Sequence, residues 1–131
     1  MTESSQGFLP YGRQSIDKDD IDAVIRVLKS NNLTEGPLID EFEKAFAQKV
    51  GSKYAVVCSS GTAGLHLASM CLDLNKNDTV LVPAISFVAT ANAPMYTGAN
   101  VEFVDVEPNT GLISQNTLIE AIKKSKKNIK V

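Results

Sequence analysis

Four small polar residues separate an apolar run from a helix-like stretch in the first half of the sequence. Residues 54–58 read as a buried strand, the stretch 59–62 (SSGT) follows, and residues 63–74 read as a helix. The first N–H groups of a helix are unpaired and partly positive, so they bind anions, and hydroxyl side chains add donors. The glycine among them lets the backbone approach a bulky ligand. The stretch predicts an anion site, although a simple helix cap from Ser60 or Thr62 explains it equally well.

The spacing of this stretch excludes two familiar phosphate motifs. A P-loop needs GxxxxGK[ST], and the lysine is absent. A dinucleotide fingerprint needs GxGxxG, which is absent as well. A phosphate bound here would therefore belong to another kind of ligand.

A second candidate lies just after the next predicted strand, at 79–82. Residues 83–90 (PAISFVAT) follow that strand, and ligands gather where the carboxyl ends of parallel strands meet. Phe87, at the start of a helix predicted at 87–96, can lay its ring on a planar ligand held by the neighbouring turn. Taken alone, Phe87 is better explained as a core residue, and only the neighbouring anion site favours a binding role.

The elements that would position these residues alternate along the chain from residue 53 onward. Further strands are expected at 101–106 and 128–131, and a further helix at 114–124. This alternation predicts an α/β fold with a largely parallel sheet flanked by helices. Because the chain stops in the last apolar strand, we expect a truncated sheet with exposed edges, the front portion of a larger protein.

Two amphipathic helices precede the alternating region. Asp17 and Asp20 form a capping-box pair at the start of the first helix. Pro37 suits the first turn of the second helix, and Gly51 is a natural stop for it.

Composition narrows the class of protein. The 131 residues are 44% hydrophobic and 21% charged with a net charge of −2, which fits a globular domain without the basic face that nucleic acid requires. No apolar run approaches the ~20 residues of a membrane span, and the polar N-terminus fits no signal or transit peptide. Cys58 and Cys71, with one histidine in the chain, argue against a zinc site. They read as buried free thiols of a cytoplasmic protein.

Three blocks of the sequence resemble the DegT/StrS-type sugar aminotransferases, which are pyridoxal-phosphate enzymes of the aspartate-aminotransferase fold (fold type I). The blocks are LPYGRQSIDKDDIDAVIRVLKSNNLTEGP, SSGTAGLHLA and VPAISFVATANAPMYTGANVEFVDV. The resemblance is greatest to the branch that aminates UDP-4-keto-6-deoxy-hexosamines, as in pseudaminic acid and polysaccharide biosynthesis. It implies that residues 1–36 form an N-terminal arm and helix, and that residues 37–131 form an incomplete large domain that binds pyridoxal phosphate.

The resemblance implies a role for both candidates in cofactor binding. Gly61, Thr62 and Ala63 would hold the cofactor phosphate through backbone amides and the Thr62 hydroxyl. Ser60 would lie beside them, and Phe87 would stack on the pyridine ring.

The resemblance also implies a substrate region in the first block. His66 is expected to be structural. The residues expected near the sugar nucleotide are Tyr11, Asn31, Asn32, Leu33 and Thr34.

The reactive groups of this family are not among the matched residues. A lysine that holds pyridoxal 5′-phosphate as a Schiff base, and an aspartate that pairs with the pyridinium nitrogen, are both expected beyond Val131. Asp105 ends a strand, but its place in the pattern FVDV argues for a structural role. We therefore expect the 131 residues alone to lack transaminase activity. The lysines that read as solvated charge are Lys123, Lys124, Lys126, Lys127 and Lys130.

The function that the resemblance implies is transamination of a nucleotide-linked 4-keto sugar, with glutamate as the amino donor. It also implies a homodimer, whereas the cytoplasmic location and the absence of metal, nucleic-acid and membrane partners are expected from the composition given above. Several alternatives stay open: a relative that dehydrates its sugar, a regulator, a catalytically incomplete module that pairs with a partner subunit, or an unrelated domain that binds a phosphate sugar.

Overall fold

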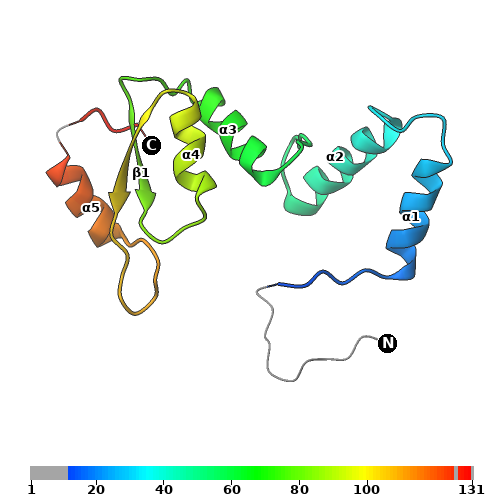
Figure 1. Ribbon diagram of the computed structural model, residues 1–131, viewed down its shortest axis with the longest axis horizontal. Helices are drawn as coiled ribbons and strands as arrows, with labels where there is room; N and C mark the ends of the chain where they lie inside the picture. Colours follow the sequence, from blue (N-terminus) through cyan, green and yellow to red (C-terminus); the bar gives the residue numbers. More distant parts are fainter. Residues whose placement is uncertain (1–11, 126, 131) are drawn as a thin grey trace. The chain divides into compact units, whose positions relative to one another are not determined.

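The computed structural model describes residues 12–125 and 127–130, which belong to two compact units divided between Val56 and Val57 (Figure 1). The first unit contains helices, and the second contains the sheet. The predicted division into an arm at 1–36 and a large domain at 37–131 stays a prediction.

The first unit contains two helices whose ends are set by local chemistry. Helix α1 (Lys18–Leu28) begins with the predicted capping box. The Asp17 carboxylate accepts the N–H of Asp20 at 3.1 Å, and the Asp20 carboxylate accepts the N–H of Asp17 at 3.0 Å. Helix α2 (Pro37–Val50) ends at Gly51, whose φ of 70° is a left-handed conformation that glycine adopts without steric cost. Both predicted helices are confirmed.

A short parallel sheet forms the centre of the second unit. Strands β1 (Thr79–Pro83) and β2 (Asn100–Val104) pair in parallel, with Thr79 opposite Asn100. At the other edge of β1, a third segment joins through one parallel bridge between Thr79 and Ile129, flanked by backbone hydrogen bonds of 2.8 and 3.0 Å. These pairings confirm the predicted parallel sheet of an α/β fold.

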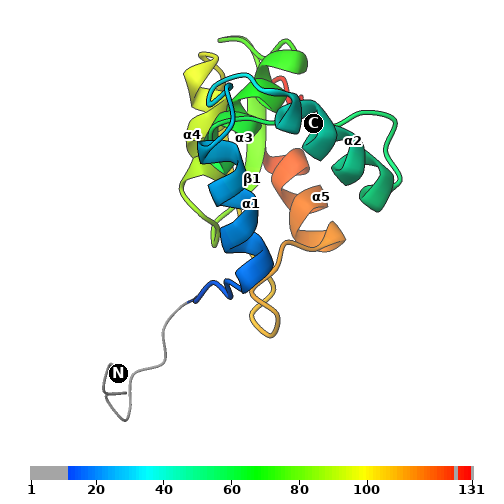
Figure 2. The same ribbon diagram turned by 90° about the vertical axis from the view of Figure 1, so that its right-hand side faces the viewer.

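Helices lie on both sides of this sheet. Helix α3 (Gly61–Cys71) packs on α4 (Ala89–Tyr96), and α4 contacts both strands, whereas α5 (Gln115–Lys124) contacts β2. Figure 2 shows α5 on the opposite side of the strands from α3 and α4. Within the described ranges, no helix has both the length and the apolar character that crossing a membrane requires. The buried residues of α4 and of the strands it contacts include Val82, Ala89, Ala93 and Val104.

Two helices begin or end at residues other than those predicted. Helix α3 begins two residues earlier than predicted and ends three residues earlier. It cannot continue through Asp73, because the φ of that residue is 52°, outside the α-helical region. Helix α4 begins two residues later than predicted. The N–H of Ala84 still pairs with the C=O of Val104 at 2.9 Å, so residues 84–88 form the turn that leaves the sheet.

The predicted buried strand at 54–58 is wrong. The structure assigns no strand to these residues, and the Tyr54 and Val56 side chains are 73% and 81% exposed. An apolar run is stable as a buried strand only where cross-strand neighbours and a covering layer exist. The sheet formed by the described residues consists of β2, β1 and the bridge at Ile129.

Both cysteines are free, as predicted, but the prediction that they are buried is wrong. Cys58 belongs to the same uncovered segment, and Cys71 ends α3. Helix α3 is apolar around most of its circumference, yet its main contacts within the described residues are with α4. Leu67 and Met70 are consequently about half exposed as well.

Asp78 connects neighbouring segments at the amino end of β1 through its buried carboxylate and its backbone. Asp78 is 4% exposed, and its Oδ2 accepts both the backbone N–H and the side-chain amide of Asn75, at 3.0 and 2.8 Å. Its Oδ1 accepts the side-chain amide of Asn128 at 3.3 Å, and the Lys130 ammonium lies 3.9 Å from Oδ2. Asn100, at the start of β2, donates its N–H to the Asp78 C=O at 2.9 Å. Asp78 therefore helps to fix where the last segment joins the sheet.

Two lysines near the C-terminus form ion pairs while staying solvated as predicted, since the side chains of Lys127 and Lys130 are 52% and 41% exposed. Lys130 pairs with Asp78, and Lys127 lies 3.1 Å from the Glu102 carboxylate. The chain after α5 returns to the edge of β1, which brings these two ammonium groups to carboxylates of the sheet. The two lysines at the end of α5 are exposed as expected, and position 126 lies outside the described residues.

Glu102 should make part of the stability of this unit depend on pH. A hydrogen bond from the Ser125 side chain, followed by the interaction with Lys127, lowers the pKa of Glu102. A lowered pKa in the folded state stabilises the fold above the unfolded-state pKa, and this contribution is lost as the pH falls through the folded-state value. We expect Glu102→Gln to reduce the free energy of unfolding at neutral pH. The difference should shrink as the pH falls below the ordinary value of 4.5.

Urea unfolding of both proteins at a series of pH values measures this difference. Glu120→Gln, which affects a carboxylate paired with the exposed Lys124 at 3.5 Å, is the control. A stability difference for Glu102→Gln that persists undiminished at strongly acidic pH would contradict the assignment.

Candidate anion and ring-stacking site

The first turn of α3 presents unpaired donors, and we call residues 60–63 the anion cup. Ser60 is the N-cap, and the first hydrogen bond of the helix runs from the Gly64 N–H to the Ser60 C=O at 3.0 Å. The N–H groups of Gly61 and Thr62 have no acceptor among the described residues. Two donors at the positive end of a helix are therefore free to bind an anion.

The Ser60 hydroxyl caps the helix without losing its own donor. Its Oγ accepts the N–H of Ala63 at 3.1 Å, which is the simple cap considered as the alternative. A hydroxyl that accepts a hydrogen bond still has a proton to donate. Ser60 can therefore cap α3 and donate to an anion at the same time. Of the three backbone amides that the resemblance implies, those of Gly61 and Thr62 are unpaired, and that of Ala63 is bonded to Ser60.

The first turn of α3 contributes no carboxylate of its own. The first turn of α1, in contrast, contains Asp19 and Asp20. At the start of α5, the Ser114 hydroxyl donates to the Glu107 carboxylate at 2.6 Å. A phosphate at α3 would meet free donors and the positive end of the helix dipole without a like charge in that turn.

Gly64 lets the segment that enters α3 approach the helix closely, whereas the space beside Gly61 is open. A Cβ added to Gly61 would meet nothing within 4 Å, whereas one added to Gly64 would lie 3.3 Å from the Cys58 Sγ. The same thiol donates to the Ser60 C=O at 3.2 Å. The segment before α3 thus packs directly on the first turn of the helix, and a side chain at Gly64 would crowd the Cys58 thiol.

Phe87 lies on the turn between β1 and α4, close to the start of the helix that packs on α3. Its side chain is 74% exposed, so the alternative that it belongs to the core is wrong. Its C=O accepts the Thr90 N–H at 3.0 Å, and the Ser86 Oγ lies 2.7 Å from the Thr90 Oγ1. Helices α3 and α4 run side by side, both beginning toward the carboxyl ends of the strands (Figure 1). The cup and Phe87 therefore lie at the starts of adjacent helices.

The residues predicted to lie near the substrate belong to the first unit. Residues 31–34 are in the connection between α1 and α2, where Asn32 and Leu33 line a cavity of about 150 Å³. Gly36 lines it as well, and a Cβ added there would lie 3.2 Å from the Asn32 C=O. Tyr11 lies outside the described residues.

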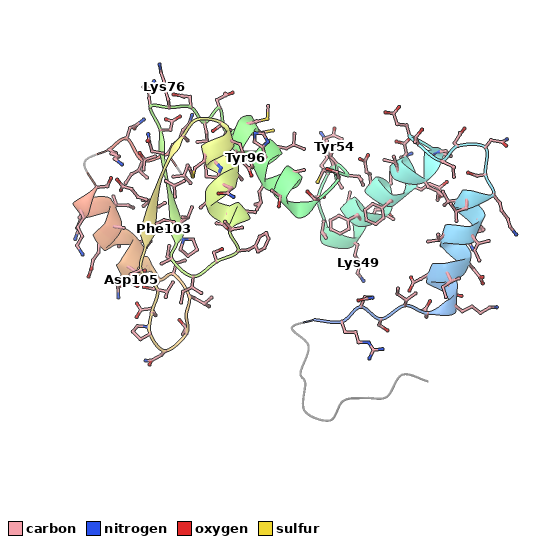
Figure 3. All side chains as sticks on the ribbon, in the orientation of Figure 1. Lys49, Tyr54, Lys76, Tyr96, Phe103 and Asp105 are labelled. Atoms are coloured by element: carbon pink, nitrogen blue, oxygen red, sulfur yellow. The ribbon has the colours of Figure 1, made fainter. Side chains whose placement is uncertain are left out.

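Two other polar residues of the second unit make contacts that do not involve the anion cup. The His66 ring contacts the Tyr96 ring edge-on, with 5.3 Å between centroids, and so links α3 to α4. The Asp105 carboxylate accepts the N–H of Val106 at 2.9 Å, and β2 ends two residues earlier than predicted. Asp105 and Phe103 line a cleft of about 590 Å³ between β2 and α5, and Figure 3 shows both beside α5. The described residues contain no group of three or more His, Cys, Asp or Glu side chains that could hold a metal ion.

Two features of the second unit were not apparent from the sequence. Ser86 and Thr90 are four residues apart and lie on either side of the start of α4. This spacing predicts a hydrogen bond between the two hydroxyls only when the start of the helix is already known. Asp78 stands three residues after Asn75 in a predicted turn, a spacing typical of side chains that bond to nearby backbone. Nothing in the sequence around Asp78 predicts its contact with residues near the C-terminus.

Comparison with known proteins adds the family. The model of the DegT/DnrJ/EryC1/StrS aminotransferase family matches residues 14–131. The chain belongs to this family. The match confirms the family predicted from the three sequence blocks, and it covers both the anion cup and Phe87.

Relatives of this DegT/DnrJ/EryC1/StrS family chain include both transaminases and a dehydratase. It is 41% identical over 121 residues to the UDP-4-amino-4,6-dideoxy-N-acetyl-beta-L-altrosamine transaminase of Campylobacter jejuni, an alignment that covers 92% of this chain and 32% of that protein. The structure of E. coli GDP-4-keto-6-deoxy-D-mannose-3-dehydratase with bound hydrated PLP superposes with a TM-score of 0.81 at 35% identity, covering 92% of this chain and 32% of that one. The aminotransferase from Psychrobacter cryohalolentis gives a TM-score of 0.76 at 34% identity, covering 85% of this chain and 29% of that one. The chain spans about a third of the length of these relatives.

Proposed function

We propose that the full protein carrying this chain transfers an amino group to a nucleotide-linked 4-keto sugar, with pyridoxal 5′-phosphate as cofactor and glutamate as donor. The observation that carries the proposal is the family match over residues 14–131, combined with a first turn of α3 whose donors fit a phosphate. This chain would supply the part of the site that binds the cofactor phosphate and stacks on the cofactor ring. The expected homodimer and cytoplasmic location belong to the same proposal.

The residues of the anion cup fit the phosphate of this cofactor. The unpaired amides of Gly61 and Thr62, the Thr62 hydroxyl and the proton of the Ser60 hydroxyl would all donate to phosphate oxygens. None of these residues can act as a strong acid or base at neutral pH, so their task is to bind and orient. When bound, pyridoxal phosphate supplies an electron sink for breaking bonds at the amino-donor carbon.

Phe87 would fix the plane of the cofactor ring. An exposed aromatic side chain beside a helix start offers a face for offset stacking on a pyridine ring, which contributes about 0.5–1.5 kcal/mol beyond the area it buries. Stacking also excludes water from that face of the ring. We further propose that residues 31–34 and Tyr11 contribute to sugar-nucleotide binding.

A second candidate function is dehydration of a nucleotide-linked 4-keto sugar. It is favoured by the 35% identity and TM-score of 0.81 with the E. coli dehydratase. Both candidates use the same cofactor-binding residues of this chain, so they differ in the product and not in the proposed role of the cup.

The product formed by the full protein tests the proposal. The purified protein is incubated with pyridoxal 5′-phosphate, glutamate and a UDP-linked 4-keto-6-deoxy-N-acetylhexosamine, and the sugar is analysed by mass spectrometry. We expect an amino sugar and 2-oxoglutarate in equal amounts, and no amino sugar without an amino donor. A sugar that has lost one further hydroxyl group and gained no amino group would instead support dehydration. An unchanged sugar with both UDP- and GDP-linked substrates would overturn both candidates.

A further inference from the structure

The turn that carries Phe87 is held at both ends by hydrogen bonds. At the strand side, the Ala84 N–H donates to the Val104 C=O at 2.9 Å. At the helix side, the Ser86 Oγ and the Thr90 Oγ1 lie 2.7 Å apart, a distance typical of a hydrogen bond between hydroxyls. Phe87 lies between these two anchors, on the segment that joins β1 to α4 in Figure 1.

The hydroxyl pair is not an ordinary helix cap. A serine just before a helix usually accepts a backbone N–H of the first turn, but α4 has no side-chain cap. The first N–H groups of α4 bond to backbone carbonyls instead: those of Thr90 and Ala91 donate to Phe87 and Val88, at 3.0 and 3.1 Å. Ser86 therefore closes a ring of five residues through Thr90 rather than satisfying a free N–H of the helix.

The exposed Phe87 ring depends on this backbone for its position. A buried ring is held by the side chains around it, whereas the Phe87 side chain is 74% exposed and has few neighbours to hold it. Its location is therefore set mainly by the backbone from which it projects. A hydrogen bond that restricts the backbone of residues 86–90 therefore also restricts the positions that the Phe87 ring can adopt.

We propose that Ser86 and Thr90 form a hydroxyl clamp that positions Phe87 for stacking on the cofactor ring, an inference that rests on the proposed function. The clamp residues are positioning residues and need not touch the cofactor. Their contribution to cofactor affinity is made through Phe87, because the clamp orders the ring before binding and so lowers the entropic cost of stacking.

The test compares Thr90→Val, which removes the hydroxyl at nearly constant shape, with Thr90→Ser, which keeps it. For the full protein, we expect Thr90→Val to weaken pyridoxal 5′-phosphate binding about fivefold, because the Phe87 side chain must then be ordered during binding, and Thr90→Ser to restore the affinity. Calorimetric titration measures the affinity. The circular dichroism that the bound cofactor acquires reports the orientation of its ring, and it should change in Thr90→Val and not in Thr90→Ser.

Thr97→Val is the matched control at the other end of the same helix. The Thr97 hydroxyl donates to the Pro94 C=O at 2.7 Å, so this substitution removes an equivalent bond far from Phe87 along the chain. It should lower the stability of the protein comparably and leave cofactor affinity within twofold of the unsubstituted protein.

Coupling to Phe87 decides whether the clamp acts through the ring. In a Phe87→Leu background, Thr90→Val should have no further effect on affinity, and Ser86→Ala combined with Thr90→Val should be no worse than either alone. Suppose that the unsubstituted protein binds the cofactor. The clamp is then overturned, and the proposed function is not, if Thr90→Val binds the cofactor equally well. The same conclusion follows if Thr90→Val reduces the affinity by the same factor with Phe87 and with Leu at position 87. If the unsubstituted protein does not bind pyridoxal 5′-phosphate, the proposed function is overturned and the clamp with it.

Discussion

Replacing Thr62 by glutamate is expected to weaken pyridoxal 5′-phosphate binding to the full protein by about 100-fold. The new carboxylate would stand in the anion cup, beside the unpaired amides of Gly61 and Thr62, where we propose the phosphate binds. Two unit charges about 4 Å apart repel by about 4 kcal/mol at the effective dielectric of a protein surface, and water at the half-buried Thr62 reduces this. About 1.4 kcal/mol corresponds to tenfold in affinity, so a 100-fold loss is a moderate expectation.

The same substitution should not weaken the fold, which separates binding from folding. A glutamate in the first turn of a helix interacts favourably with the helix dipole, by about 0.3–1 kcal/mol. Thr62→Gln, which has nearly the same shape without the charge, is the control and should bind far more tightly than Thr62→Glu. Calorimetric titration and thermal unfolding of both variants measure the two effects. Equal affinities of Thr62→Glu and Thr62→Gln would contradict the location of the phosphate.

Replacing Asp78 by alanine is expected to lower the free energy of unfolding by about 3 kcal/mol. The carboxylate is buried and accepts three hydrogen bonds, two from Asn75 and one from Asn128, and it lies near the Lys130 ammonium. Removing it takes away the one buried acceptor that these donors share, although the Asn75 and Asn128 side chains themselves reach water. The loss of one partner from such a network typically costs several kcal/mol.

Urea unfolding of the full protein measures this cost, and two further variants interpret it. Asp78→Asn keeps one acceptor oxygen but removes the charge, so an intermediate loss is expected. Glu120→Ala removes a carboxylate whose pair with Lys124 is exposed on both sides, and it should change stability by no more than about 0.5 kcal/mol. A loss below 1 kcal/mol for Asp78→Ala would show that the network does not hold the last segment to β1.

The features that could be predicted from sequence are those that depend on neighbours within a few residues. The capping box of Asp17 and Asp20, the stop at Gly51 and the donors at the start of α3 all follow from local chemistry. The burial of residues 54–58 could not be predicted in this way, because it depends on which strands lie beside them in space. The apolar pattern showed what these residues prefer to contact, and the structure shows that the described sheet does not cover them.

The candidate site divides in the same manner. The anion cup was predicted from SSGT because a helix start concentrates its donors in one turn of chain. Phe87 was found as a candidate from its place after a strand, but its exposure could not be known before the fold. The bond between Ser86 and Thr90 depends on two side-chain rotamers and on where α4 begins, and a one-residue error in that boundary would hide it.

The Ser60 cap has a consequence for how a ligand would be received. Because the hydroxyl of Ser60 already accepts the Ala63 N–H, the first turn of α3 is shaped by the chain itself and needs no anion to hold it in place. A ligand arriving at such a preorganised turn loses little affinity to ordering the protein, so more of its interaction energy remains as binding. The cofactor phosphate should then bind to a preformed site at this end of the helix, and the helix content of the protein should change little on binding.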